Sequence, residues 1–553
     1  MINYNDIIIQ KNIELLLEGF YNKELPPIFD YNKYIYRIIN IFNKFSNGIY
    51  SEKINREETP AYTYNNGIEP IVYYDFKKNN TLREMMLPCF KSYIIFMYKT
   101  IGVFEILFKK LYSEADYAKY VFNSNSNLLS NDTFCVTDNY DMIEEEIEGY
   151  FYQIYNNKRI RDSMYTINEN KILNIIGTKQ YYFKVDIESF YPNVYSHLLR
   201  NLKNNNMYKG LNCGSYFDFL DEYNMKINND QTKGIVTGIY SSVVSSELLM
   251  LTVDNEIRNI LKDNVGYIRY VDDMLFSADS KDDFYKLFPK IQEILNKYGL
   301  RINPNKIEVH PSIYYKSYTD IIYVRREIDI LLKDKKIVIN RDNINHLKHS
   351  IISLIEQNDI STLRALLSYL RCFVSDKLIF DCEEYVDIFV KYLVLLAFTE
   401  PLLATRCYMI LDLLIENENG YSERILNTLL SKTLSIDDKY NNTILQIWHY
   451  YLLIKYKKIS FKDFIKKKQI DDINPIIISF FVEYEKDVVE IFKNIKRCFC
   501  SESGLKPAKM IFMQQIMCSK WWMPIMFIML KNNDKLNKYF NNNYFDKFYK
   551  EFI

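Results

Sequence analysis

Hydrophobic and polar residues follow different patterns along successive stretches of the chain. Between about 90 and 165 apolar residues recur at helical spacing, as in the run Ile94, Ile95, Met97, Ile101, Phe104, Ile106 and Leu107. Between 180 and 330, short β-prone runs such as 181–187 and 265–270 alternate with helical stretches, which is typical of an α+β domain. Residues 1–80 give no assignable pattern.

After about residue 340 the pattern is helical throughout. Candidate helices cover 344–356, 361–373, 383–398, 402–415, 422–431, 443–456 and 474–495. Thr399 before Glu400 and Pro401 predicts an N-cap, and Gly420 follows the end of that helix. Successive helices with short connections favour an all-α repeat or bundle, although no sharp repeat signature is present.

The length and the net charge of the chain restrict the number of domains and the kinds of ligand that we expect. A chain of 553 residues with 48 % apolar residues predicts two or three folded domains. Lys+Arg and Asp+Glu balance at 70 each, which argues against extensive nonspecific binding of duplex nucleic acid. A local basic run is interpreted as a solvated helix face; it contains Lys455, Lys457, Lys458, Lys462, Lys466, Lys467 and Lys468.

Cysteine usage and the absence of long apolar segments predict a soluble, cytoplasmic protein with no membrane partner. The only close cysteine pair, Cys498 and Cys500, has poor spacing for zinc and suits reduced thiols. No secretory signal opens the sequence, and the apolar block 521–530 is too short to span a bilayer.

Three aspartates carry the candidate chemistry. Asp186 ends an apolar β-like run, and Asp272-Asp273 separate two such runs, which predicts a hairpin with acids at its tip. Adjacent carboxylates repel each other unless a cation binds there. Nucleotidyl transfer uses two divalent ions roughly 3.5–4 Å apart, and Mg²⁺ prefers carboxylate ligands. We therefore predict that the three side chains converge on one metal site.

Several segments, in order, resemble the motifs of reverse transcriptases over roughly residues 80–325. They are Arg83 with Leu87-Pro88, the run 186–197, the run 234–242 followed by Glu247 and Asp254, Tyr270-Val271-Asp272-Asp273, and the run 299–306. The Phe-Tyr-Pro and Tyr-Ser-His parts of 186–197 resemble, more narrowly, the abortive-infection (Abi, AbiK-like) group of bacterial antiphage reverse transcriptases. The implied fold is α+β, with palm and fingers followed by an all-α helical-repeat region.

The resemblance implies a metal site of four ligands. Asp186, Asp272 and Asp273 are expected to bind Mg²⁺, or alternatively Mn²⁺, and the backbone carbonyl of Ile187 to complete the site. Tyr191 is expected to lie under the sugar and exclude a 2′-hydroxyl, with a core aromatic as the alternative.

The remaining implied residues contact the nucleotide. Gly238 would allow its backbone to approach the nucleotide closely. Lys306 would protonate or neutralise the leaving pyrophosphate. Arg83 would hold oxygens of the triphosphate. A surface lysine and a surface ion pair remain alternatives for Lys306 and Arg83.

The same resemblance implies the domain organisation. Residues 1–80 form an unassigned N-terminal extension, 81–335 the fingers and palm, and 340–553 a helical-repeat domain that replaces the thumb. Val236-Thr237 depart from the Pro and following apolar residue or Gln of many reverse transcriptases, which alters the wall beside a template base. The implied activity is untemplated, protein-primed DNA synthesis from dNTPs in antiphage defence, by a homo-oligomer whose DNA is linked to a tyrosine.

Two other hypotheses stay open at this level. One is an RNA-templated reverse transcriptase with a noncoding RNA partner. The other is a nuclease or nucleic-acid-sensing effector that uses the palm as a scaffold. Related RNA-cleaving helical domains carry an arginine a few residues before a histidine. His449 lacks this arginine, since the nearest upstream is Arg424, which disfavours the nuclease.

Overall fold

The computed structural model describes residues 12–13, 15–29, 67–77, 81–108, 172–261, 264–316, 320–333, 336–374, 378–417, 420–503 and 515–531. Residues 109–165 of the predicted helical stretch 90–165 lie outside these residues.

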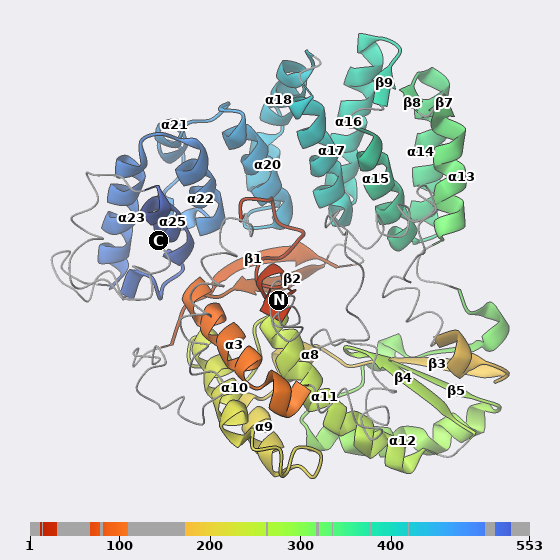
Figure 1. Cartoon of the computed structure of the whole chain (residues 1–553). Coiled ribbons are helices and arrows are strands. Elements are labelled where there is room, and N and C mark those ends of the chain that lie inside the picture. Colours follow the sequence, from red (N-terminus) through yellow and green to blue (C-terminus); the bar gives the residue numbers. More distant parts are fainter. Residues whose placement is uncertain are drawn as a thin grey trace, which may run out of the picture.

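A four-stranded antiparallel sheet lies on one side of the α+β part, at the lower right in Figure 1. Its order is β4-β5-β3-β6, with bounds β3 Tyr181–Asp186, β4 Gly266–Tyr270, β5 Asp273–Ala278 and β6 Glu308–Pro311. The strands predicted at 181–187 and 265–270 are confirmed. β4 and β5 form the predicted hairpin, in which only Val271 and Asp272 separate the two strands.

Helices pack on the sheet through apolar faces. α12 (Lys281–Lys297) begins at Ser280, whose side chain accepts a hydrogen bond from the Asp283 amide. Phe284 on its buried face stacks on Phe183 of β3, with ring centroids 4.1 Å apart. α11 (Tyr240–Ile260) is a long, largely buried helix that contacts α12.

A hairpin and several helices stand beside the sheet (Figure 1). Their bounds are β1 Ile71–Phe76, β2 Leu82–Leu87, α3 Phe90–Gly102, η2 Phe104–Phe108, α8 Phe190–Asn193, α9 Ser196–Asn201, η3 Leu202–Asn204 and α10 Gly214–Ile227. β1 pairs with β2 in register from Ile71 opposite Leu87 to Phe76 opposite Leu82. α3 contacts α10, where Phe96 stacks on Tyr223 at 5.1 Å. The hairpin that contains Arg83 therefore includes residues before position 81.

Helices from α13 onward form an arc along one side of the α+β part (Figure 1). Their bounds are α13 Ile321–Leu331, α14 Arg341–Glu356, α15 Ile360–Val374, α16 Glu383–Thr399, α17 Ala404–Glu416, α18 Ser422–Leu430, α19 Thr433–Lys439, α20 Ile444–Lys455, α21 Phe461–Ile465, α22 Pro475–Tyr484, α23 Val488–Ser503 and α25 Trp522–Leu530. Short 3-10 turns complete the set: η4 Pro304–Lys306, η5 Ser312–Tyr314, η6 Pro401–Leu403 and η7 Ile470–Asp472. The predicted mixed α+β fold with a helical C-terminal region is confirmed.

Local details of the arc differ from the sequence analysis. Thr399 is the last residue of α16 and does not cap the next helix, since Pro401 opens a 3-10 turn instead. The helix predicted at 474–495 is two helices, because Glu485 adopts extended backbone after α22. A small sheet of β7 (Leu332–Lys333), β8 (Lys336–Ile339) and β9 (Leu378–Phe380) also lies among the helices.

The helical arc contacts the β1–β2 hairpin and the N-terminal segment directly. Asn442 and Asn474 both donate from their side-chain amides to the carbonyl of Val72, at 3.2 and 3.0 Å. The carbonyl of Glu24 accepts from Trp448 Nε1 at 2.7 Å and from Thr405 Oγ1 at 3.0 Å. These contacts fix the arc against the edge of the hairpin.

Among the described residues, no helix has both the length and the apolar character that crossing a bilayer requires.

Candidate active site

Strand register brings the predicted aspartates together. In the antiparallel pair β3–β5, Asp186 is the direct partner of Asp273, so the two side chains lie on the same face. Asp272 lies in the turn before β5, one residue away. Asp186 and the adjacent pair Asp272-Asp273 thus meet at one end of the sheet, although 86 positions of sequence separate Asp186 from Asp272.

The turn that carries Asp272 has an unusual backbone. Val271 adopts a φ of 54°, in the left-handed region. This region is unfavourable for a β-branched residue and requires surrounding contacts to maintain it.

Desolvation and neighbouring charges raise the pKa values of Asp272 and Asp273. Desolvation, followed by the nearby charges of Asp272 and Asp186, raises the pKa of Asp273 to about 6. Desolvation and the charge of Asp186 also raise the pKa of Asp272. Arg83 and Lys306 oppose the rise at Asp272, which places both cations near the site.

Lysine and arginine side chains surround the acids. Lys306 Nζ lies 2.8 Å from Asp186 Oδ1, and its segment is fixed by a hydrogen bond from the Asn303 amide to the Asp186 carbonyl. Arg83, on β2, is exposed. The pKa of Lys77 is lowered by desolvation and by the charges of Arg83 and Lys306, so a third cation lies close by. Lys77 has no signal in the sequence, because its position follows from the β1–β2 pairing.

The donor set fits a hard divalent cation. Carboxylate oxygens are the ligands that Mg²⁺ prefers. Ile187 and Ile302 form an isolated β-bridge. Its hydrogen bonds involve the Asp186 carbonyl and the Glu188 amide, and the Ile187 carbonyl takes no part in them. Among the described residues, the trio whose ligand atoms lie within 4.8 Å of one another is Asp471, Cys498 and Glu502. The ligand atoms of the three aspartates are spaced more widely than those of this trio. To bind one ion together with Asp272 and Asp273, the side chain of Asp186 would rotate away from Lys306.

Tyr191 lies near Asp272, whereas Gly238 lies against the β1–β2 hairpin. Desolvation and the charge of Asp272 raise the pKa of Tyr191, and the nearby Ser246 of α11 opposes this rise. The ring is therefore beside the aspartates and also packed in the core, so both interpretations of Tyr191 have a basis. Gly238 has a φ of 106°, and an added Cβ would lie 2.7 Å from Met85 Cε. The side of Gly238 that lacks a Cβ is therefore filled by Met85 of the β1–β2 hairpin, where the Met86 amide donates to the Thr237 carbonyl at 2.9 Å.

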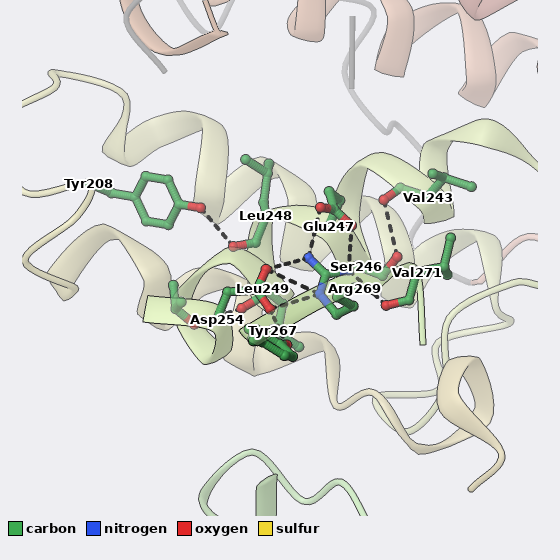
Figure 2. A network of polar contacts seen from close by, with 11 residues as sticks. Tyr208, Val243, Ser246, Glu247, Leu248, Leu249, Asp254, Tyr267, Arg269 and Val271 are labelled. Atoms are coloured by element: carbon green, nitrogen blue, oxygen red, sulfur yellow. Dashed lines mark hydrogen bonds and ion pairs between the residues drawn. The ribbon is translucent and has the colours of Figure 1, made fainter. Parts of the chain in front are cut away.

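A buried ionic network behind the turn was missed by the sequence analysis. Arg269 of β4 is fully buried and contacts Glu247 and Asp254 of α11 (Figure 2). Two signals in the sequence point to it. Arg269 is a charged residue in the apolar run of β4, and Glu247 and Asp254 are seven residues apart on one face of a helix.

His449 and the basic run 455–468 have structural roles among the described residues. His449 is fully buried, between the Tyr408 hydroxyl at 3.0 Å and the Thr433 hydroxyl at 3.1 Å. Burial lowers its pKa to about 3, so it stays neutral. The basic run is not one solvated helix face, because it extends from the end of α20 across α21, and three of its lysines are half-buried in ion pairs: Lys455, Lys458 and Lys468.

Comparison with known proteins supports the same region. Residues 135–329 match the family model described as reverse transcriptase (RNA-dependent DNA polymerase). This span contains the three aspartates, Tyr191, Gly238 and Lys306, whereas Arg83 lies before it. A search of curated proteins finds no match.

Solved structures with similarity to the chain include telomerases of two Candida species. Apo telomerase from Candida tropicalis is 13 % identical, with a TM-score of 0.30 over 79 % of this chain and 77 % of that one. Its form truncated from the C-terminal domain is also 13 % identical, with a TM-score of 0.28, and covers 46 % of this chain. The chain spans about half of that structure, 52 %. Telomerase from Candida albicans with a fragment of telomeric RNA is 11 % identical, with a TM-score of 0.25 over 65 % of this chain and 64 % of that one. Similarity at this level carries no conclusion about substrate or partner.

Proposed function

We propose that this chain, whose residues 135–329 match the reverse transcriptase family model, is a DNA polymerase that joins dNTPs at Asp186, Asp272 and Asp273. The observation that carries the proposal is the register of β3 and β5, which makes Asp186 and Asp273 cross-strand partners beside the Asp272 turn. The cations Lys306, Arg83 and Lys77 around this acidic centre suit a triphosphate, which is strongly negative.

Each side chain has a chemical role in this proposal. The three aspartates and the Ile187 carbonyl would hold Mg²⁺ or Mn²⁺, which supplies positive charge at the attacking and leaving oxygens. The ammonium group of Lys306 would exchange its ion pair with Asp186 for one with the pyrophosphate. It would then neutralise or protonate the pyrophosphate as it leaves. Arg83 would bind phosphate oxygens in fork geometry. Tyr191 would restrict space at the 2′-position of the sugar.

The finer proposal is protein-primed synthesis without a template, in antiphage defence, by a homo-oligomer. It rests on the resemblance of 186–197 to abortive-infection reverse transcriptases and on Val236-Thr237 in place of the usual template wall. Val236 is fully buried and Thr237 is half-buried, so this support rests on the side chain of Thr237. A tyrosine hydroxyl would then supply the first nucleophile, and the DNA would stay attached to the protein.

A single assay separates the alternatives. Purified chain is incubated with labelled dNTPs and Mg²⁺ without nucleic acid, beside the Asp272→Asn/Asp273→Asn variant. Labelled product that migrates slowly and disappears after protease treatment supports the protein-primed polymerase. Strict dependence on added RNA supports the RNA-templated reading, in line with the family description. Equal incorporation by wild type and the double variant would overturn the assignment of the aspartates.

The nuclease hypothesis is weakened further by the burial of His449. A side chain that is 0 % exposed and bonded at both ring nitrogens is not positioned to reach a phosphodiester.

A further inference from the structure

The guanidinium of Arg269 has every one of its five N–H donors engaged. Nε and Nη2 donate to Asp254, Nη1 and Nη2 donate to the two oxygens of Glu247, and Nη1 also donates to the carbonyl of Val271 at 2.7 Å. Tyr267 Oη donates to Asp254 Oδ1 at 2.7 Å. The network is compact and buried, and it joins β4 to α11 (Figure 2).

Stability alone is a weak explanation for such a network. Buried ion pairs lose much of their attraction to desolvation, and well-packed apolar residues often serve equally well. Four of the five donors end on carboxylates of α11. The fifth, on Val271, ends in the turn of the candidate active site, one residue before Asp272.

The Val271 contact falls where the backbone needs support. Val271 has a φ of 54°, which is an unfavourable conformation for a β-branched residue. A charged donor to its carbonyl favours the observed orientation of that peptide. The orientation of the peptide determines where the Asp272 and Asp273 side chains lie.

The other end of the network also touches the site. Glu247 follows Ser246, and both residues lie close enough to Tyr191 to influence its pKa. α11 therefore lies next to both Arg269 and the aromatic ring beside the aspartates. The network thus sets the position of the aspartate turn relative to the wall formed by Tyr191.

We infer that Arg269 is a positioning residue, which holds the Val271 carbonyl and thereby aligns Asp272 and Asp273 for divalent-cation binding. This inference rests on the proposed function for its biological meaning, but metal binding tests it separately. Groups that orient metal ligands typically change metal affinity by about 10–100-fold when they are removed.

The test is a titration of the full chain with Mn²⁺, followed by electron paramagnetic resonance. Arg269→Lys keeps the positive charge, but the compact ammonium group has three N–H donors where the planar guanidinium has five. It is expected to weaken Mn²⁺ binding about 10-fold. Asp272→Asn gives the signal expected when a ligand itself is lost.

Tyr267→Phe is the matched control. It removes one hydrogen bond from the same buried network without touching the turn. We expect it to lower the unfolding temperature as Arg269→Lys does, and to leave Mn²⁺ affinity within about twofold, below the range for orienting groups. Unchanged affinity in Arg269→Lys, or equal weakening in both variants, would overturn the inference.

A second pair covers the case in which Arg269→Lys does not fold. Glu247 shares Nη1 of Arg269 with Val271, whereas Asp254 bonds only Nε and Nη2. Glu247→Gln should therefore weaken Mn²⁺ binding more than Asp254→Asn, and equal effects would contradict the positioning role. If wild type binds Mn²⁺ but incorporates no dNTP, the polymerase proposal fails while this comparison still decides the role of Arg269.

Discussion

At the scale of single residues, the acidic centre is destabilising by itself. The pKa of Asp273 is raised to about 6, so its ionised form is unfavourable in the folded chain. The folded state binds more protons than the unfolded state between the ordinary aspartate pKa and 6. The free energy of unfolding therefore falls as the pH rises through this window.

We predict that Asp273→Asn raises the unfolding temperature of the metal-free protein at pH 7.5. Asp273 is exposed, and after solvent screening the gain should be on the order of 1 kcal/mol, or a few degrees. The difference should shrink as the pH falls from 6 to 4 and reverse at pH 7.5 when Mn²⁺ is added. Thermal unfolding with EDTA and with Mn²⁺ measures both effects. A variant less stable than wild type in EDTA would contradict the raised pKa.

The sequence was sufficient for some residues of the site and not for others. Asp186, Asp272 and Asp273 were visible because each borders an apolar β-like run. Arg269 was not identified, because its partners lie on a helix 15 and 22 residues earlier. Lys77 became visible only through the pairing of β1 with β2. Pair contacts between elements are tertiary information, which local periodicity does not contain.

At the scale of elements, apolar periodicity identified most helices and strands, but not where adjacent helices separate. The run 474–495 reads as one helix, since apolar residues continue across the break. In the structure α22 ends at Tyr484, and the amide of Phe461 is bonded by Glu485. Neither Gly nor Pro marks the break, so the contact of Glu485 with another helix decides it.

Gly238 offers a test of the contact between the β1–β2 hairpin and the run 234–242. Gly238→Ala would strain a φ of 106° and bring Cβ against the methyl of Met85. Gly299→Ala is the control, because Gly299 has a φ of 67° and nothing within 4 Å of its added Cβ.

Both variants should lose about 1–2 kcal/mol of stability from the left-handed backbone. Gly238→Ala alone should also raise KM for dNTPs several-fold, because Met85 is displaced where the hairpin meets Thr237. Steady-state incorporation and urea unfolding measure the two effects. Equal KM values would show that Gly238 serves the backbone conformation only.

At the scale of the whole molecule, the N-terminal segment links the α+β part to the helical arc. The carbonyl of Glu24 accepts from Trp448 and Thr405, and its carboxylate lies 3.3 Å from Arg406. Phe20 packs on Trp522, with ring centroids 5.9 Å apart. These contacts join residues roughly 380 to 500 positions apart, which no reading of local sequence predicts.

Substitutions at two tryptophans distinguish the contribution of the hydrogen bond to Glu24 from the contribution of side-chain packing to the stability of this link. Trp448→Phe removes the bond to Glu24 as well as volume. Trp522→Phe removes volume alone, because within the described chain its Nε1 has no hydrogen-bond partner. Trp448→Phe should cost about 1–2 kcal/mol more than Trp522→Phe in urea unfolding. Equal losses would mean that the Glu24 bond contributes nothing to the link.

The β1–β2 hairpin is anchored along both of its edges. Val72 and Tyr74 of β1 bond to Asn442 and Asn474 of the helical arc, and Met86 of β2 bonds to Thr237 of the run 234–242. A hinge motion of this hairpin on its own would break one set of bonds or the other. A displacement of the helical arc would therefore be transmitted through the hairpin to the run 234–242.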